Sequence, residues 1–179
     1  MTQNKLDTLL KQDKKIFHTN DLGLLWDIEN KNSLYKSISR LVKKGTLFSI
    51  HKGLYSVLPI NDLDPIKLGV SVIHKYNYLS CETILAQKGI ILQATYKITF
   101  VSENSKNIMV GNNNYLVRKL KSQFLYNTAG VYAKADGVLY ASTSRAVADM
   151  LYFQPSYHFD APNLIDWKKV KDIQLEVGY

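Results

Sequence analysis

Two prolines, Pro59 and Pro65, bracket a short polar and acidic stretch in this chain of 179 residues. Proline lacks a backbone N–H and restricts the residue before it, so a stretch of this kind interrupts helices and central strands. It therefore predicts a boundary between two packed units. We expect one domain over residues 1–59 and a second over residues 60–179, each with its own hydrophobic core.

Before this boundary, three segments have helical patterns. Leucines at helical spacing predict two short helices ahead of residue 27, the second with Thr19 as its N-cap. Asn32 or Ser33 can cap a third helix, which Gly45 ends. The apolar positions of this third helix lie on one face: Leu34, Ile38, Leu41 and Val42.

Two β-prone runs, 46–50 and 54–57, follow the third helix and flank His51-Lys52-Gly53. A short connection that contains glycine predicts a hairpin between them. Helices followed by a hairpin form the element order of a winged helix-turn-helix. In that motif the later helix enters the DNA major groove, and the hairpin lies along the backbone or the minor groove.

The candidate DNA-binding residues come from the polar face of the third helix and from the hairpin tip. They are Asn32, Ser33, Tyr35, Lys36, Ser37, Arg40, Lys43, His51 and Lys52. Lys36, Arg40 and Lys52 can neutralise phosphates, and the short or planar groups near the helix start can reach base edges. A solvated helix face has a similar composition, but the ordered set of helices, basic helix and basic-tipped hairpin favours DNA binding.

Charge supports the same assignment. The formal net charge is +8, and residues 1–59 hold ten Lys and Arg against five Asp and Glu. A basic surface favours a polyanion through counterion release, which indicates nucleic acid or an anionic membrane. No run approaches the length and apolar character of a membrane helix, and the N-terminus lacks an apolar signal-peptide core. We expect a cytoplasmic protein without membrane association.

The second segment predicts an α+β domain. Helical patterns near residues 65–76, 80–88, 143–152 and 164–173 alternate with β-prone runs at 96–102, 107–110, 115–120, 131–133 and 138–141. Turn residues between short strands favour a largely antiparallel or mixed sheet. Arg145 and Asp149 are four residues apart on one helix face and can form an ion pair.

Several segments together resemble the AbiEi-type antitoxins, the winged-helix regulators of type IV toxin-antitoxin systems. The resemblance lies in residues 17–22, 33–45, 52–55 and 80–90, and in Arg145 and Asp149; Ser144 departs from the usual glutamate of that family. It implies that the protein represses its own operon by binding inverted repeats in the promoter. It also implies that the protein counters a nucleotidyltransferase toxin without a stable complex.

Two alternatives stay open. The first is a winged-helix module that binds another protein. The second is a nuclease or nucleotide-modifying enzyme that uses Asp136, Asp149 or Asp166 in the C-terminal segment. The sequence has no phosphate-binding glycine loop, zinc motif or nucleophile elbow, and its single cysteine, Cys81, has no partner histidine placed by sequence. We therefore expect no catalytic residues, no metal and no cofactor.

Overall fold

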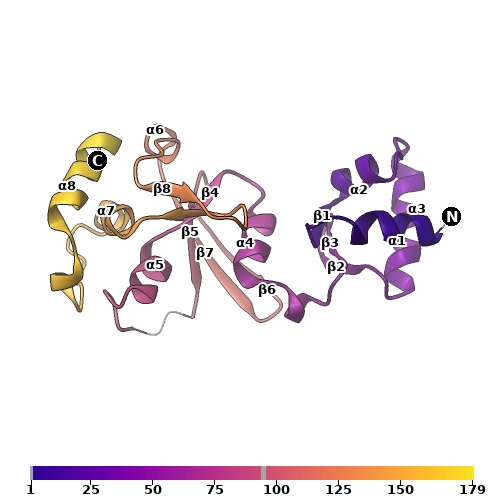
Figure 1. Cartoon of the computed structure of the whole chain (residues 1–179), viewed down its shortest axis with the longest axis horizontal. Coiled ribbons are helices and arrows are strands. Elements are labelled where there is room, and N and C mark those ends of the chain that lie inside the picture. Colours follow the sequence, from indigo (N-terminus) through magenta and orange to yellow (C-terminus); the bar gives the residue numbers. More distant parts are fainter. Residues whose placement is uncertain (1, 94–95) are drawn as a thin grey trace. The chain divides into compact units, whose positions relative to one another are not determined.

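A computed structural model describes residues 2–93 and 96–179, and its contacts divide the chain into two compact units (Figure 1). The first unit runs to Val72 and includes Val110–Asn112, and the second comprises Ile73–Met109 and Asn113–Tyr179. The division lies beyond the proline-flanked stretch because Pro65 begins a helix. Proline is accepted at this position because the backbone nitrogen of a first-turn residue has no partner within the helix. The Asp64 carboxylate caps the helix by accepting the N–H groups of Ile66 and Lys67.

The first unit contains the helices and the hairpin that the sequence predicts. Its elements are α1 (Thr2–Leu10), β1 (Ile16–His18), α2 (Thr19–Leu25), α3 (Lys31–Lys43), β2 (Phe48–His51), β3 (Leu54–Ser56), the 3-10 turn η1 (Ile60–Asp62) and α4 (Pro65–Ile73). The strands form one antiparallel sheet in the order β1-β3-β2. Strand β1 therefore joins the β2–β3 hairpin as a third strand. The residues Ile16 and Phe17 suggest a short extended segment, but they do not identify β3 as its partner.

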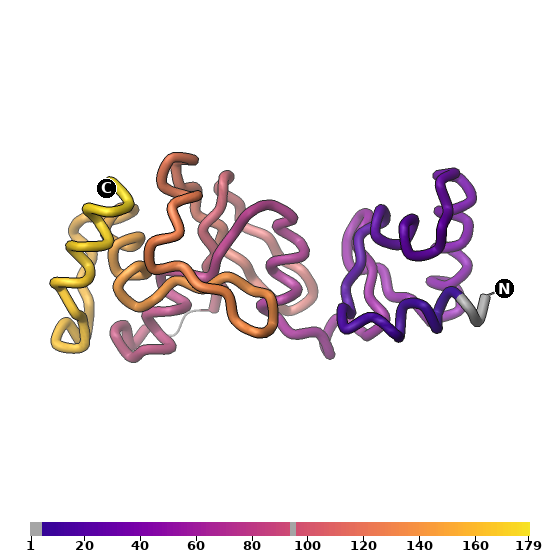
Figure 2. The backbone as a smooth tube through the Cα atoms, turned by 45° about the horizontal axis from the view of Figure 1, so that its top comes forward, coloured from indigo at the N-terminus to yellow at the C-terminus, as the bar shows by residue number. Residues whose placement is uncertain are grey.

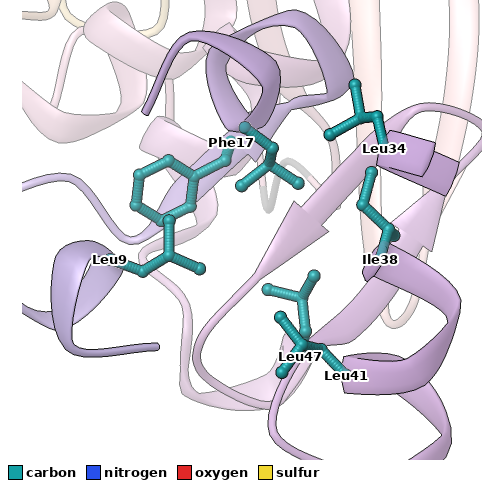
Figure 3. Close-up of a cluster of buried hydrophobic side chains, with 7 residues drawn as sticks. Leu9, Phe17, Leu34, Ile38, Leu41 and Leu47 are labelled. Carbon is teal, nitrogen blue, oxygen red and sulfur yellow. The ribbon is translucent and has the colours of Figure 1, made fainter. Parts of the chain in front are cut away.

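The core of the first unit joins α1, β1, α2, α3 and the start of the hairpin. Figure 3 shows side chains from these elements converging. The buried cluster consists of Leu9, Phe17, Leu22, Leu34, Ile38, Leu41 and Leu47. Burial of a large apolar side chain contributes roughly 1.5–3 kcal/mol, so this cluster fixes which face of α3 points inward.

The second unit is a sheet with helices against it. Its elements are β4 (Asn77–Leu79), α5 (Cys81–Gln87), β5 (Ile98–Ser102), β6 (Lys106–Val110), β7 (Asn113–Lys119), α6 (Ser122–Leu125), β8 (Val131–Ala133), β9 (Leu139–Ala141), α7 (Thr143–Phe153), the 3-10 turn η2 (Pro162–Leu164) and α8 (Trp167–Val177). α7 packs against α5 and α8, and Figure 2 shows the yellow α8 beside the orange α7.

The strand order of this sheet is β6-β7-β5-β4-β9-β8. β4 is antiparallel to β5 and parallel to β9, β5 is parallel to β7, and β8 is antiparallel to β9. The architecture is therefore mixed α and β with a mixed sheet, and antiparallel pairing does not dominate its centre. The parallel pairing of β5 with β7 arises because β6 lies at the edge, outside β7.

Candidate nucleic-acid interface

The N-cap of helix α3 is Asn30, which lies two residues before Asn32 and three before Ser33. Asn30 has extended backbone angles, and its side-chain oxygen accepts the N–H of Ser33 at 3.0 Å. The prediction that Asn32 or Ser33 caps the helix is therefore wrong, because Asn30 satisfies the free N–H of the first turn. Asn32 and Ser33 instead lie inside that turn, and both are exposed.

The two faces of α3 differ sharply in burial. Leu34, Ile38 and Leu41 are at most 5% exposed, and they face the core. The opposite face exposes most of the candidate residues: Asn32, Ser33, Tyr35, Lys36, Arg40 and Lys43. Helix α3 contains no acidic residue. Because its apolar side chains pack into the core, the amphipathic spacing places its cations on the outer face.

The cations of this face have no ion-pair partner among the residues that the structure describes. Among residues 2–93 and 96–179, no carboxylate forms an ion pair with Lys36, Arg40 or Lys43. The first unit has an ion pair between Lys14 and Asp21 at 2.6 Å, and neither residue belongs to α3. An unpaired cationic helix face is a surface that can attract phosphate groups.

Ser37 lies at the margin of this face. Its side chain is half-buried, and its hydroxyl accepts a hydrogen bond from the Lys5 ammonium at 2.8 Å. The Lys5 ammonium also lies 5.4 Å from the centre of the Trp26 ring, whose Nε1–H donates to the Lys5 carbonyl at 3.1 Å. Ser37 thus joins α1 to α3, and its hydroxyl is already engaged inside the protein.

The hairpin tip exposes His51 and Lys52 beside the glycine of the turn. Gly53 has φ of +77°, a left-handed conformation that L side chains rarely adopt. The Gly53 carbonyl accepts hydrogen bonds from the Thr19 N–H at 2.9 Å and from the Thr19 hydroxyl at 3.3 Å. The start of α2 therefore holds the turn that presents Lys52.

Thr19 is a positioning residue that sequence reasoning assigned a different role. It is the first residue of α2 and not its N-cap, which is His18. The Asp21 carboxylate accepts a hydrogen bond from the His18 N–H at 3.0 Å, so Asp21 supplies a capping bond at the start of α2. The Thr19 hydroxyl is then available to bond to Gly53. The local sequence pattern indicates a helix cap at Thr19. It does not reveal that the Thr19 hydroxyl bonds to Gly53, which lies 34 residues farther along the chain.

In the second unit, the predicted pair of Arg145 and Asp149 forms and is completely buried. The Arg145 Nε lies 2.9 Å from Asp149 Oδ1, and both side chains are 0% exposed. Asp149 also accepts hydrogen bonds from the hydroxyls of Ser80 at 2.7 Å and Tyr78 at 3.0 Å, and from Tyr179. Burial, followed by the charge of Asp149, raises the pKa of Tyr78, so this phenol remains neutral.

The remaining donors of Arg145 are bonded to the backbone carbonyls of Phe124, Asn127 and Ala129 and to the Tyr78 hydroxyl. A buried charge pair whose polar atoms are bonded this completely is part of the scaffold. Asp136 and Asp166 lie elsewhere: the first accepts the Tyr140 hydroxyl, and the second caps α8. Within the described parts of the chain, no group of three His, Cys, Asp or Glu side chains could hold a metal ion.

No protein-family model matches the chain, and no curated protein matches it significantly. In the described segments, no helix combines the length and the apolar character needed to cross a membrane. The exposed face of α3 and the β2–β3 turn, with the contacts described above, form the candidate interface.

Proposed function

We propose that this protein is a DNA-binding transcriptional regulator whose first unit acts as a winged helix-turn-helix. In this proposal α3 enters the major groove, and the β2–β3 turn contacts the phosphate backbone. The observation that carries it is the exposed set of Lys36, Arg40 and Lys43 on α3, which form no ion pair with any described carboxylate and lie opposite the buried apolar face of the helix. Lys52 on a turn held by Thr19 supplies a second contact.

The narrower form of the proposal is an autorepressor that binds inverted repeats in its own promoter. Tyr35 and Ser33 then contact the groove, while Lys36 and Arg40 contact phosphates or bases. The resemblance to the AbiEi-type antitoxins supports this form. It also supports an antitoxin role against a nucleotidyltransferase toxin, exerted by the second unit without a stable complex.

A salt-titrated binding assay tests DNA binding. The full chain is titrated against its own upstream region and against shuffled DNA of the same length. We expect selective binding whose logarithm falls steeply with the logarithm of salt concentration, because each neutralised phosphate releases counterions. Equal, weak binding to both DNAs, or weak salt dependence, would instead support a protein-binding module.

Single substitutions locate the interface. We expect Arg40→Ala to weaken selective binding by about 1–3 kcal/mol if Arg40 reads a base, and Lys52→Ala to reduce the salt slope by about one unit. The matched control is Lys168→Ala, which removes an exposed cation of α8. Unchanged affinity and unchanged salt slope for both Arg40→Ala and Lys52→Ala would remove α3 and the turn from the interface.

The antitoxin role is tested separately, by first asking whether a neighbouring gene encodes a nucleotidyltransferase and then co-expressing that enzyme with the full chain. We expect the full chain to restore the growth of cells that express the toxin. The Arg40→Ala/Lys52→Ala double variant should restore growth equally if the second unit provides the antitoxin activity. A double variant that represses poorly but still protects would separate the two roles, and no protection by the unaltered chain would eliminate the antitoxin role.

A further inference from the structure

The three serines of helix α3 differ in whether their hydroxyls are available to a ligand. Ser37 is half-buried, and its hydroxyl accepts a hydrogen bond from the Lys5 ammonium at 2.8 Å. Ser33 and Ser39 are exposed, and neither hydroxyl forms a hydrogen bond with another described residue. The sequence pattern favours Ser37 as a DNA contact, whereas in the folded unit the available hydroxyl is that of Ser39.

The buried stripe of α3 fixes the direction in which each outer side chain projects. This stripe lies on one side of the helix (Figure 3) and consists of Leu34, Ile38 and Leu41. At about 100° of rotation per residue, Asn32 and Lys36 project within about 30° of the direction opposite to the stripe. Ser39 projects about 50° from that direction. Asn32, Lys36 and Ser39 therefore form an outer ridge that faces away from the core.

The outer ridge is the part of α3 that can approach base edges most closely. Asn32 and Ser39 have short side chains, which reach a base only where the helix backbone lies close to the floor of the major groove. Tyr35 and Ser33 project toward the two flanks, roughly 90–110° from the buried stripe, where the walls of the groove lie. We therefore expect base contacts from the outer ridge and wall contacts from the flanks.

The side chains of the outer ridge have distinct base preferences. The Asn32 amide offers a donor and an acceptor together, which matches N6 and N7 of adenine. The Lys36 ammonium only donates, which matches O6 and N7 of guanine. The Ser39 hydroxyl both donates and accepts, so it can bond to either kind of base edge. Among the described residues, none forms a hydrogen bond with the Asn32 amide or an ion pair with Lys36.

The spacing of these residues sets the order of the bases that they can contact. Asn32 and Lys36 are four positions apart, which is about 6 Å along a helix. Base pairs stack about 3.4 Å apart, so this distance spans about two base pairs for a helix that follows the groove. Ser39 lies about 4.5 Å beyond Lys36, which is roughly one further base pair.

We propose that α3 reads DNA sequence through Asn32, Lys36 and Ser39. The preferred half-site carries an adenine at Asn32, a guanine about two base pairs farther along at Lys36, and a third selected base about one base pair beyond, at Ser39. This inference rests on the proposed DNA-binding function and names the sequence class that the same surface recognises.

Selection from random duplex DNA by the full chain gives the preferred half-site directly. We expect the enriched sequence to contain the adenine and the guanine at that spacing. Fluorescence anisotropy then measures the affinity of each single-base change in the half-site. Wild type should lose about tenfold in affinity when the adenine or the guanine is replaced.

Matched substitutions assign each base to its side chain. Asn32→Ala should bind the adenine site and its replacements equally, and Lys36→Met should do the same at the guanine. Ser39→Ala should lose discrimination at the base beyond the guanine. The control is Ser37→Ala, which removes a hydroxyl of the same helix that is engaged by Lys5, and it should keep full discrimination at every position. Circular dichroism should show the same folded state for all four variants.

The outcomes separate this inference from the proposed function. If wild type enriched no sequence, DNA recognition by this chain would fail and the inference with it. If wild type enriched a sequence without the adenine and guanine at this spacing, only the inference would be overturned. The same holds if the outer-ridge variants weakened binding to every sequence by the same factor, or if Ser37→Ala lost as much discrimination as Ser39→Ala.

Discussion

Asp149 lies at the centre of a buried polar network in the second unit. Its carboxylate lies in a fully buried position, faces the guanidinium of Arg145, and accepts hydrogen bonds from Ser80 and Tyr78. We expect Asp149→Ala to lower the free energy of unfolding by about 3–5 kcal/mol, because the substitution leaves the Arg145 charge buried without a partner. Urea denaturation followed by circular dichroism measures this loss.

The control for this substitution is Asp172→Ala, which removes an exposed carboxylate from α8. A surface substitution of this kind usually changes stability by less than about 0.5 kcal/mol. If Asp149→Ala cost no more than Asp172→Ala, the buried network would not stabilise the unit.

At the scale of single elements, the start of α2 depends on Asp21. Partial burial raises the pKa of this carboxyl, but the hydrogen bonds from Lys14 and the His18 N–H outweigh burial and lower it below its usual value. A carboxyl with a lowered folded-state pKa stabilises the fold above its unfolded pKa. That contribution is lost as pH falls through the folded-state pKa.

We therefore expect Asp21→Asn to destabilise the first unit by about 1 kcal/mol at neutral pH. The difference from wild type should narrow as pH falls below the ordinary carboxyl value of 3.8. Chemical denaturation at neutral pH and at pH values below 3.8, monitored by circular dichroism, measures both differences. If the free energies of unfolding of wild type and Asp21→Asn differed by the same amount at every pH, the charge of Asp21 would contribute nothing to stability.

At the scale of the whole molecule, the proposed inverted repeats make a geometric prediction. Two copies that bind one face of the duplex need half-sites about one helical turn, near 34 Å, or a multiple of it apart. Inserting about five base pairs between the half-sites should reduce cooperative binding, because the second copy then faces the opposite side. Inserting about ten base pairs should restore it.

Gel-shift titrations of the three operators check this expectation, with the number of bound copies read from the ladder of complexes. A single isolated half-site serves as the control for the affinity of one copy. Binding that is insensitive to the insertion would show that the copies bind independently or that one copy suffices.

Much of the local structure was predictable because it depends on short-range chemistry. The spacing of Leu34, Ile38 and Leu41 determines which face of α3 is buried, and hence which candidate side chains are exposed. Gly45 follows the C-terminal end of α3, and Gly53 lies in the turn between β2 and β3, as their positions in the sequence predicted. The pairing of Arg145 with Asp149 also follows from a four-residue helical spacing.

Other features depend on partners that lie far apart in the sequence. The bonds of Ser37 to Lys5 and of Thr19 to Gly53 span more than 30 residues, and local patterns do not identify them. The caps at Asn30 and His18 were misassigned because several neighbouring polar residues compete for the same free N–H groups.

Periodicity and turn chemistry act within a few residues, so the amino-acid pattern predicts the helices of the first unit, its hairpin and the basic outer face of α3. The sheet order β6-β7-β5-β4-β9-β8 and the complete burial of Arg145 follow only from long-range packing. These outcomes depend on which distant strands pair, and that choice is set by the packing of the whole unit.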